Sequence, residues 1–242
     1  MKSKLFFLLL LLNAEAFAQT TINKTITVQP GQMITMNFDY PQLIKISTWD
    51  KNEISITGTV SINEGENDDA FLLKTSSQGN EISITGKMKD MESLPHRITI
   101  KRDGKKIIFK TKADYNKYAD LNGRDYNSMS WGPAIDIFLE IKVPSNKETK
   151  VFSVYGTIEV KDFRAPLIAQ STYGGVDVVL TEKEVGDLKA ATNYGQIFTN
   201  LDQNFKEGVF EDFHTVVSAK LGSGPRYSVE SKYGNVYLRK AL

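Results

Sequence analysis

The stretch Ser153-Val-Tyr155-Gly156-Thr-Ile158 is one of four versions of the pattern that decides the fold predicted for this chain. In each version Ser or Thr stands three residues before a glycine, Tyr directly before it, and Ile or Val two residues after it. The other three read Ser171-Thr-Tyr173-Gly174-Gly-Val176, Thr192-Asn-Tyr194-Gly195-Gln-Ile197 and Ser231-Lys-Tyr233-Gly234-Asn-Val236. Successive glycines are 18, 21 and 39 residues apart, and a period of about 20 residues is typical of a solenoid. We therefore expect an all-β protein in which residues 135–242 form a parallel β-helix, or β-solenoid, with coils of about 20 residues.

The pattern also predicts how one coil is built. Alternation along the strand places the Ser or Thr, the Tyr and the later Ile or Val on the inward face. Glycine turns the corner because it tolerates positive φ. Equivalent side chains on adjacent strands lie about 4.8 Å apart, so Tyr would stack on Tyr and the hydroxyls could bond along a ladder. The structural repeat thus comprises Tyr155, Gly156, Tyr173, Gly174, Tyr194, Gly195, Tyr233 and Gly234. The inward placement favours a structural role for these tyrosines over an exposed aromatic stripe that contacts carbohydrate or protein.

Residues 19–134 are predicted to be an irregular β-rich part that forms early coils or a cap. The heptapeptide Asn-Glu-Ile-Ser-Ile-Thr-Gly occurs at 52–58 and again at 80–86, which indicates two similar strand units. Asp103-Gly104 lies between two apolar strands and favours a type I′ hairpin turn.

A long loop is expected at residues 110–133, where the strand rhythm stops. Aromatic side chains supply contact area at low entropic cost, and long loops are often functional. Tyr115, Tyr118, Tyr126 and Trp131 are therefore the candidate ligand contacts, and a flexible insertion without a ligand is the alternative.

Residues 1–18 have the features of a secretory signal peptide. Lys2 and Lys4 precede a short apolar run, and Ala16-Phe-Ala18 supplies a cleavage site. We expect an exported protein of the periplasm or the cell surface. It would not be a lipoprotein, because no Cys follows the cleavage site, and no later segment reaches the length of a membrane span.

The composition argues against several function classes. Residues 19–242 contain 28 basic and 28 acidic residues, whereas nucleic-acid-binding proteins usually carry a basic excess. The absence of Cys removes thiol catalysis and Cys-type zinc sites. His96 and His214 have no motif partners, so we expect no cofactor and no metal. The position three residues after the repeat glycine offers one carboxylate pair, Glu159 and Asp177, which would be neighbours in stacked coils.

Three segments carry a resemblance to a known family: residues 139–160, the repeated Tyr-Gly coils, and residues 221–238. They resemble the bacterial putative-adhesin β-solenoid proteins, closely over about 135–242 and loosely over 40–110. Family members often have Asn or Asp where this chain has Tyr before the glycine. The resemblance implies an exported parallel β-helix at the cell envelope, with no catalytic motif.

These observations predict a non-enzymatic cell-envelope protein. It would be an adhesin-like binding or scaffold module with a surface for a glycan or an envelope or host protein. A polysaccharide-active β-helix enzyme using Glu159 and Asp177, and a periplasmic structural or signalling partner, are the alternatives.

Overall fold

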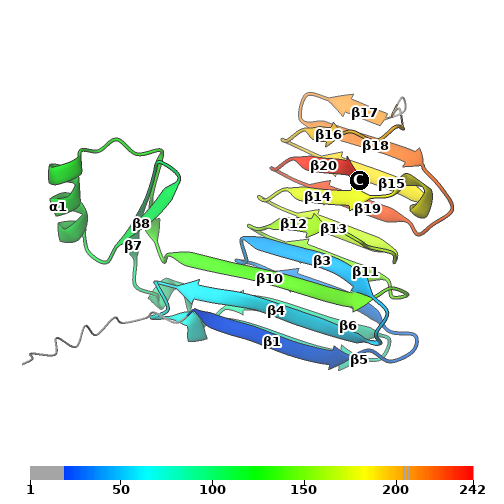
Figure 1. The fold of residues 1–242 in the computed structure, drawn as a ribbon, viewed down its shortest axis with the longest axis horizontal. Coiled ribbons are helices and arrows are strands. Elements are labelled where there is room, and N and C mark those ends of the chain that lie inside the picture. The colour runs from blue at the N-terminus through cyan, green and yellow to red at the C-terminus, as the bar shows by residue number, and fades with distance from the viewer. Residues whose placement is uncertain (1–18, 204, 206–207, 242) are drawn as a thin grey trace, which may run out of the picture.

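Two large mixed β-sheets packed face to face form the body of the protein (Figure 1). The computed structural model describes residues 19–203, 205 and 208–241, so the expected signal peptide lies outside the described residues. Sheet A contains, in spatial order, β1 (Thr20–Thr27), β4 (Glu53–Ile62), β10 (Ile135–Pro144), β3 (Leu43–Trp49), β12 (Thr157–Val160), β14 (Val176–Leu180), β20 (Val236–Lys240) and β16 (Ile197–Thr199). Sheet B contains β17 (Gly208–Glu211), β18 (His214–Lys220), β15 (Asp187–Thr192), β19 (Tyr227–Ser231), β13 (Leu167–Ser171), β11 (Thr149–Ser153), β2 (Met33–Phe38), β6 (Glu81–Met88) and β5 (Phe71–Gln78).

Alternation of apolar and polar residues explains why these segments form strands with one buried face. Ile54 and Ile56 of β4 and Ile82 and Ile84 of β6 are at most 1% exposed, so the two heptapeptide copies contribute equivalent positions to opposite sheets. The inward faces of both sheets share one continuous apolar core that runs from Val28 to Leu238. Three short 3₁₀ turns, at Asp68–Ala70, Met91–Ser93 and Glu182–Glu184, lie in connections between strands.

The predicted parallel β-helix is wrong. Each sheet is parallel at its centre, but β1, β4 and β10 pair antiparallel at one end of sheet A. In sheet B, the pairs β5–β6, β15–β18 and β17–β18 are antiparallel. The strands also do not stack in chain order, because β19 lies between β13 and β15 and β20 lies between β14 and β16. The 39 residues between the last two repeat glycines hold the antiparallel hairpin β17–β18, which reverses the chain before it returns to place β19 and β20 between strands made earlier.

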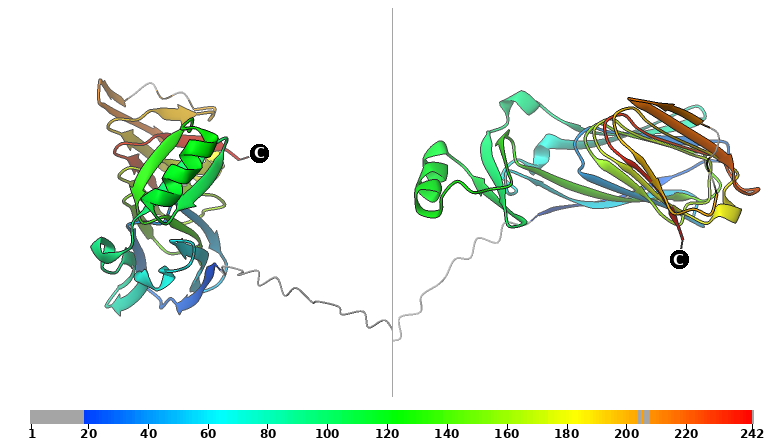
Figure 2. Two further views of the ribbon diagram at one scale, coloured as in Figure 1. Left: turned by 90° about the vertical axis from the view of Figure 1, so that its left-hand side faces the viewer. Right: turned by 90° about the horizontal axis from the view of Figure 1, so that it is seen from above.

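A smaller unit, residues 97–132, projects from the end of the body beside the start of β10 (Figures 1 and 2). It consists of a three-stranded antiparallel sheet in the order β8 (Lys105–Phe109), β7 (Arg97–Arg102), β9 (Ser128–Gly132), and the helix α1 (Lys112–Asn122). We call it the appended unit. Asp103 and Gly104 have φ of 50° and 74°, which confirms the predicted hairpin turn between β7 and β8. The segment expected as a long loop therefore contains a helix and a strand. The helix begins at Thr111, whose side chain accepts from the Asp114 amide in a capping box.

Candidate functional site

Each copy of the repeated pattern connects a strand of sheet B to a strand of sheet A along the same edge of the body. The copies link β11 to β12, β13 to β14, β15 to β16 and β19 to β20. We call this edge the turn edge. The Ser or Thr of each copy is the last residue of its sheet B strand, and all four are at most 4% exposed.

The buried hydroxyls tie successive turns together. The Ser171 hydroxyl oxygen accepts from the Gly174 amide at 3.0 Å and donates to the Gly156 carbonyl, 2.9 Å away in the neighbouring turn. Ser231 and Thr192 repeat both contacts with the glycines of their own and neighbouring turns. The sequence predicted a ladder between hydroxyls, and the structure shows a ladder from each hydroxyl to the glycine backbone. Every turn is thereby held against the next by a buried hydrogen bond.

The repeat glycines are required by close approach of the backbone. No positive φ is recorded at the four repeat glycines, so the predicted reason for a glycine at this corner is wrong. A Cβ at Gly174 would lie 2.2 Å from the Gly156 carbonyl oxygen, and one at Gly195 would lie 2.0 Å from that of Gly234. Neighbouring turns therefore stack too tightly for any side chain at this position.

The tyrosines form an exposed stack along the turn edge. Their exposed fractions are 54% for Tyr155, 54% for Tyr173, 43% for Tyr233 and 58% for Tyr194, so the predicted inward placement is wrong. The predicted stacking of Tyr on Tyr is confirmed: ring centroids are 5.3, 5.1 and 5.0 Å apart in the spatial order 155, 173, 233, 194, with interplanar angles of 8–11°. The residue-by-residue alternation ends where each sheet B strand ends, which turns the tyrosine away from the core.

Two further aromatic residues lengthen the stack. Tyr40 stacks on Tyr155 at 5.4 Å, and Phe213 packs at a tilt on Tyr194 at 5.7 Å. Burial raises the pKa of Tyr40, with smaller contributions from Tyr155 and Asp39. The register of β11 with β2 sets Ser153 beside Phe38, so Phe38-Asp-Tyr-Pro41 is a fifth version of the turn with Pro in place of Gly. This turn has Phe38 in place of the Ser or Thr and Pro41 in place of the Gly, so only its Tyr matches the repeated pattern. We call Tyr40, Tyr155, Tyr173, Tyr233, Tyr194 and Phe213 the aromatic ladder.

Stacking determines which atoms of the ladder a partner can reach. The faces of Tyr155, Tyr173 and Tyr233 lie against the rings on either side, because each has a stacked neighbour both above and below. The exposed surface of these residues is therefore made of ring edges and phenolic hydroxyls. The ladder is therefore a row of regularly spaced phenolic hydroxyls, which both donate and accept, along the apolar edges of the stacked rings.

The candidate carboxylate pair lies on the outer face of sheet A. Glu159 and Asp177 are opposite each other in the register of β12 with β14, as predicted. Asp177 also accepts from the Arg239 guanidinium at 2.7 Å, and Lys45 is the register partner of Glu159 on its other side. The next strands place Tyr237 and Phe198, stacked at 5.2 Å, at the same position. The pair therefore belongs to a row of ionic and aromatic contacts across the sheet.

The four aromatic residues predicted as ligand contacts do not form one surface. Tyr115 is 7% exposed in the core of the appended unit with Ile98, Ile100 and Phe109. Tyr118 and Tyr126 pack against that core, and the Tyr115 and Tyr126 hydroxyls are 3.1 Å apart. Trp131 is 60% exposed and contacts His96 edge to face at 5.9 Å. Three of the four thus stabilise the unit, and Trp131 alone is available for contact.

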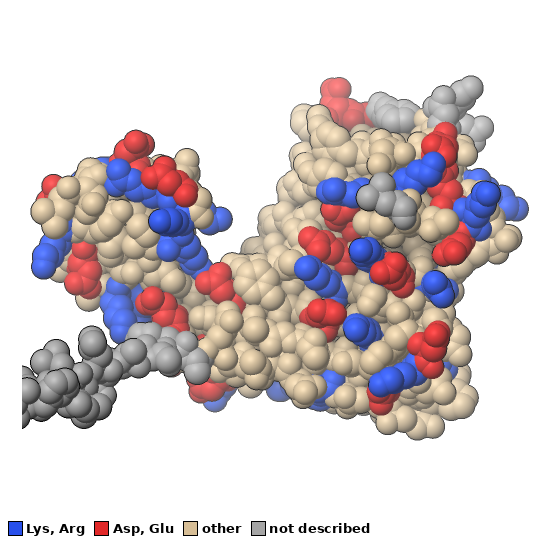
Figure 3. All heavy atoms as spheres, viewed as in Figure 1, with Lys and Arg blue, Asp and Glu red and all other residues tan. Residues whose placement is uncertain are grey.

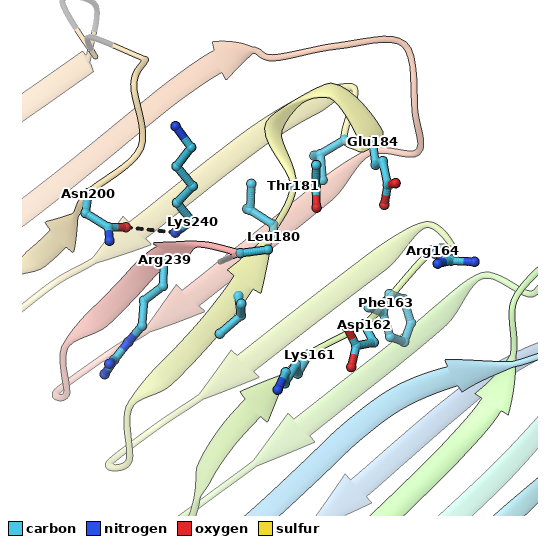
Figure 4. A pocket seen from close by; sticks show the side chains of 13 residues that line it. Lys161, Asp162, Phe163, Arg164, Leu180, Thr181, Glu184, Asn200, Arg239 and Lys240 are labelled. Atoms are coloured by element: carbon cyan, nitrogen blue, oxygen red, sulfur yellow. Dashed lines mark hydrogen bonds between the residues drawn. The ribbon is translucent and has the colours of Figure 1, made fainter.

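A hollow of about 750 Å³ lies at the ends of the sheet A strands, on the edge opposite the turn edge (Figure 4). Residues 161–164, the segment around Leu180 and Glu184, and the end of β20 surround it. Two of its four cations are already paired, Arg239 with Asp177 and Lys240 with Asp202. The Lys240 amide also donates to the Asn200 side chain at 2.8 Å. These contacts leave the hollow nearly balanced in charge.

Over the described ranges, no group of three or more His, Asp or Glu side chains is arranged to hold a metal ion. Among those same residues, no helix is long and apolar enough to span a membrane.

Comparison with known proteins gives a likeness of fold. No protein-family model and no curated protein matches the chain. The crystal structure of a "putative cell adhesion protein" from Clostridium sporogenes superimposes with a TM-score of 0.51 at 9% identity, covering 93% of this chain and all of that one. A "putative adhesin" from Bacteroides fragilis covers 93% of this chain and 98% of its own at 12% identity, with a TM-score of 0.24. The first of these shows that the two-sheet fold occurs in a protein named for cell adhesion.

Proposed function

We propose that this chain is a non-enzymatic, exported cell-envelope protein that acts as an adhesin-like binding or scaffold module, and that the aromatic ladder is its contact surface. The observation that carries the proposal is the run of four exposed, stacked tyrosines along one edge of a rigid two-sheet body. The fold shared with the clostridial cell adhesion protein supports the same function class.

The ladder has the physical properties of a binding surface. Tyrosine is enriched at the energetic centres of protein interfaces, because a large ring is immobilised at low entropic cost. Here the rings are already ordered by their neighbours and by the buried hydroxyl ladder beneath them. A partner therefore meets a surface that loses little further freedom on binding.

The stacked geometry also restricts how a partner can bind. Sugar rings commonly pack on aromatic faces, but the inner ladder residues present edges and hydroxyls instead. An extended glycan or a protein segment would run along the ridge and hydrogen-bond to several phenolic hydroxyls in succession.

The export part of the proposal rests on the sequence of residues 1–18. The expected compartment is the periplasm or the cell surface. Fractionation of cells that express the full chain, with mass determination of the mature N-terminus, tests it. Retention of Met1 in a cytoplasmic fraction would contradict export.

The experiment for the ladder is a binding screen of residues 19–242 against arrays of glycans and extracellular matrix proteins. The double variant Tyr173→Ser with Tyr233→Ser removes the centre of the ladder. The matched control, Phe198→Ser with Tyr237→Ser, removes a stacked pair on the outer face of sheet A, in which Phe198 is exposed and Tyr237 is half-buried. We expect the first variant to lose affinity by about tenfold or more and the second to bind like the wild type. Equal effects in both variants, or no ligand for the folded wild type, would contradict the proposal.

A further inference from the structure

The appended unit is strongly basic, whereas the body is acidic. Residues 97–132 carry nine basic and four acidic side chains, and the other residues of 19–242 carry 19 basic and 24 acidic ones. The unit thus has a formal net charge of +5 on a body of −5, and blue surface is prominent on the unit in Figure 3. The two charges cancel, so the net charge of residues 19–242 does not reveal that they are separated.

Part of that positive charge holds the unit against the body. Glu66 pairs with Arg97 at 2.5 Å and with Lys110, and Asp136 of β10 pairs with Lys106 at 2.5 Å. Arg97 is 7% exposed, so its ion pair is largely shielded from water. These contacts fix the three-stranded sheet relative to β10, with the face that does not pack against α1 turned toward the body.

Between that face and the body lies a cleft of about 610 Å³, within the usual range for ligand pockets. Thr99 and Lys101 of β7, Lys106 of β8 and Ser130 of β9 line one side of it. Gln42 and residues 133–136 line the other side. The cleft therefore has a wall of hydroxyl and ammonium groups facing a wall that contains apolar side chains.

The register places two like charges side by side in this cleft. Lys101 is directly opposite Lys106 in the antiparallel pair β7–β8, an arrangement that is destabilising unless the charge is compensated. Asp136 compensates Lys106. Lys101 has no ion pair within the part of the chain that the structure describes. The cleft thus holds one uncompensated ammonium group beside the hydroxyl-bearing residues Thr99 and Ser130, which are opposite each other across β7 and β9.

We propose that this cleft binds the carboxylate of an acidic sugar, a hexuronate residue of an anionic polysaccharide. The carboxylate would pair with the Lys101 ammonium group and accept from the Thr99 and Ser130 hydroxyls. The Gln42 amide nitrogen already donates to the Ile135 carbonyl at 2.7 Å, and its oxygen would serve as an acceptor for sugar hydroxyls. The apolar side chains of the opposite wall suit the C–H face of the sugar ring. This site is separate from the aromatic ladder and does not depend on it.

The test is calorimetric titration of residues 19–242 with trigalacturonate, with galactotriose as the neutral comparator and inorganic phosphate as the simple anion. We expect trigalacturonate alone to bind, with an affinity that falls as salt is added. Lys101→Gln should weaken binding by about tenfold or more, which corresponds to the loss of one charged hydrogen bond. Lys105→Gln is the matched control, because Lys105 lies in the same hairpin, is exposed and does not line the cleft.

Several outcomes would overturn the proposal: no binding of trigalacturonate, equal binding of galactotriose or phosphate, or equal losses in the two lysine variants. Thermal unfolding of Lys101→Gln is expected at or above the wild-type temperature, because the change removes a like charge opposite Lys106, so a loss of binding would not reflect misfolding. The double variant Tyr173→Ser with Tyr233→Ser should bind trigalacturonate normally. That result separates failure of the cleft from failure of the ladder.

Discussion

At the scale of single residues, the Ser-x-Tyr-Gly turn assigns a different physical task to each position. The hydroxyl satisfies one amide and one carbonyl that would otherwise be buried without partners, and the glycine lets two backbones approach. The tyrosine covers the outside of the turn and meets solvent. Stability and the proposed contact with a partner therefore depend on neighbouring residues rather than on the same one.

Replacing Ser171 with Ala should destabilise the body. The substitution leaves the Gly174 amide and the Gly156 carbonyl without their shared partner in a buried position. Each unsatisfied buried group typically costs about 1–3 kcal/mol, so we expect a loss of about that size or more in urea unfolding. Ser171→Thr is the control, since Thr192 makes the same contacts in another turn. A Thr variant as unstable as the Ala variant would contradict the role of the hydroxyl.

Replacing Gly174 with Ala should cost more than the same change at the adjacent Gly175. The added Cβ at Gly174 would meet the Gly156 carbonyl oxygen at 2.2 Å, whereas at Gly175 it would lie 3.1 Å from the nearest atom. Overpacking of this kind typically costs about 1–3 kcal/mol. The free energy of unfolding of both variants measures the difference. Equal values would mean that the turns can separate without cost.

At the scale of elements, the appended unit is an insertion with its ends side by side. Arg97 and Gly132 are register partners across β7 and β9, so the chain enters and leaves the unit at adjacent positions. The unit also has its own small core beneath α1. It is therefore separable from the body as a whole but not in parts.

Excision of residues 97–132 with a short glycine linker between His96 and Pro133 should leave a folded body. Deletion of residues 112–130 alone should be more harmful, because it strips Tyr115 and Ala119 from Ile98, Ile100 and Phe109 and exposes that core. Circular dichroism and size-exclusion chromatography of the two variants compare the outcomes. An aggregated product from the full excision would show that the body needs the unit.

The contact between the unit and the body should weaken in acid. Hydrogen bonding from the Lys110 ammonium group, with a smaller contribution from Arg97, holds the pKa of Glu66 below its usual range. Because the folded pKa is lower than the unfolded one, this contribution is complete above the unfolded value of about 4.3 and is lost as the pH falls through the folded pKa.

Denaturant unfolding of the wild type and of Glu66→Gln across this acidic range measures the effect of Glu66. We expect the stability difference between them to shrink as the pH falls. A difference that does not change with pH would show that Glu66 contributes nothing through its charge.

The elements that depend on local pattern could be predicted from the sequence. The strands around Ile54 and Ile82 and the Asp103-Gly104 hairpin follow from alternation and turn chemistry. The helix after Thr111 had a signal too, since Thr111 and Asp114 have capping-box spacing and Tyr115, Tyr118 and Ala119 share one helical face.

The outward direction of the repeat tyrosines had no signal in the sequence. It depends on each strand ending at the Ser or Thr, and the alternation of apolar and polar residues does not show where a strand ends. The cleft also had no local signal, because it unites residues from β7, β8, β9 and the body.

At the scale of the whole molecule, the order of strands departs from the order of the chain. The spacing of the repeats gives the length of chain between successive turns, but it does not show which strands are neighbours. The prediction of coils stacked in chain order assumed that successive repeats are neighbours. In the structure, β19 pairs with β13 on one side and β15 on the other, and β20 pairs with β14 and β16. Two strands from the last part of the described chain thus lie between strands that were made earlier, one in each sheet.

Truncation before Arg226 should therefore disrupt the body rather than shorten it. The deletion removes the only strands that join β15 and β16 to β13 and β14 among the described residues. We expect this variant to lose the cooperative unfolding transition that the wild type shows. Thermal scans of both proteins measure the transition. Termination after Lys240 keeps both strands and serves as the control, with a transition close to that of the wild type. A gradual, partial loss of stability in the variant that ends before Arg226 would show that β19 and β20 are not needed to join the other strands.

The position of β19 between β13 and β15 also determines when the body can fold during synthesis. A ribosome makes β15 and its antiparallel partner β18 before it makes β19, so for a period the two halves of sheet B exist without the strand that joins them. During that period the inward faces of Leu188 and Ala190 have no neighbour on one side. Completion of the body must wait until Tyr227–Ser231 has emerged, and the nascent chain exposes apolar surface to chaperones until then.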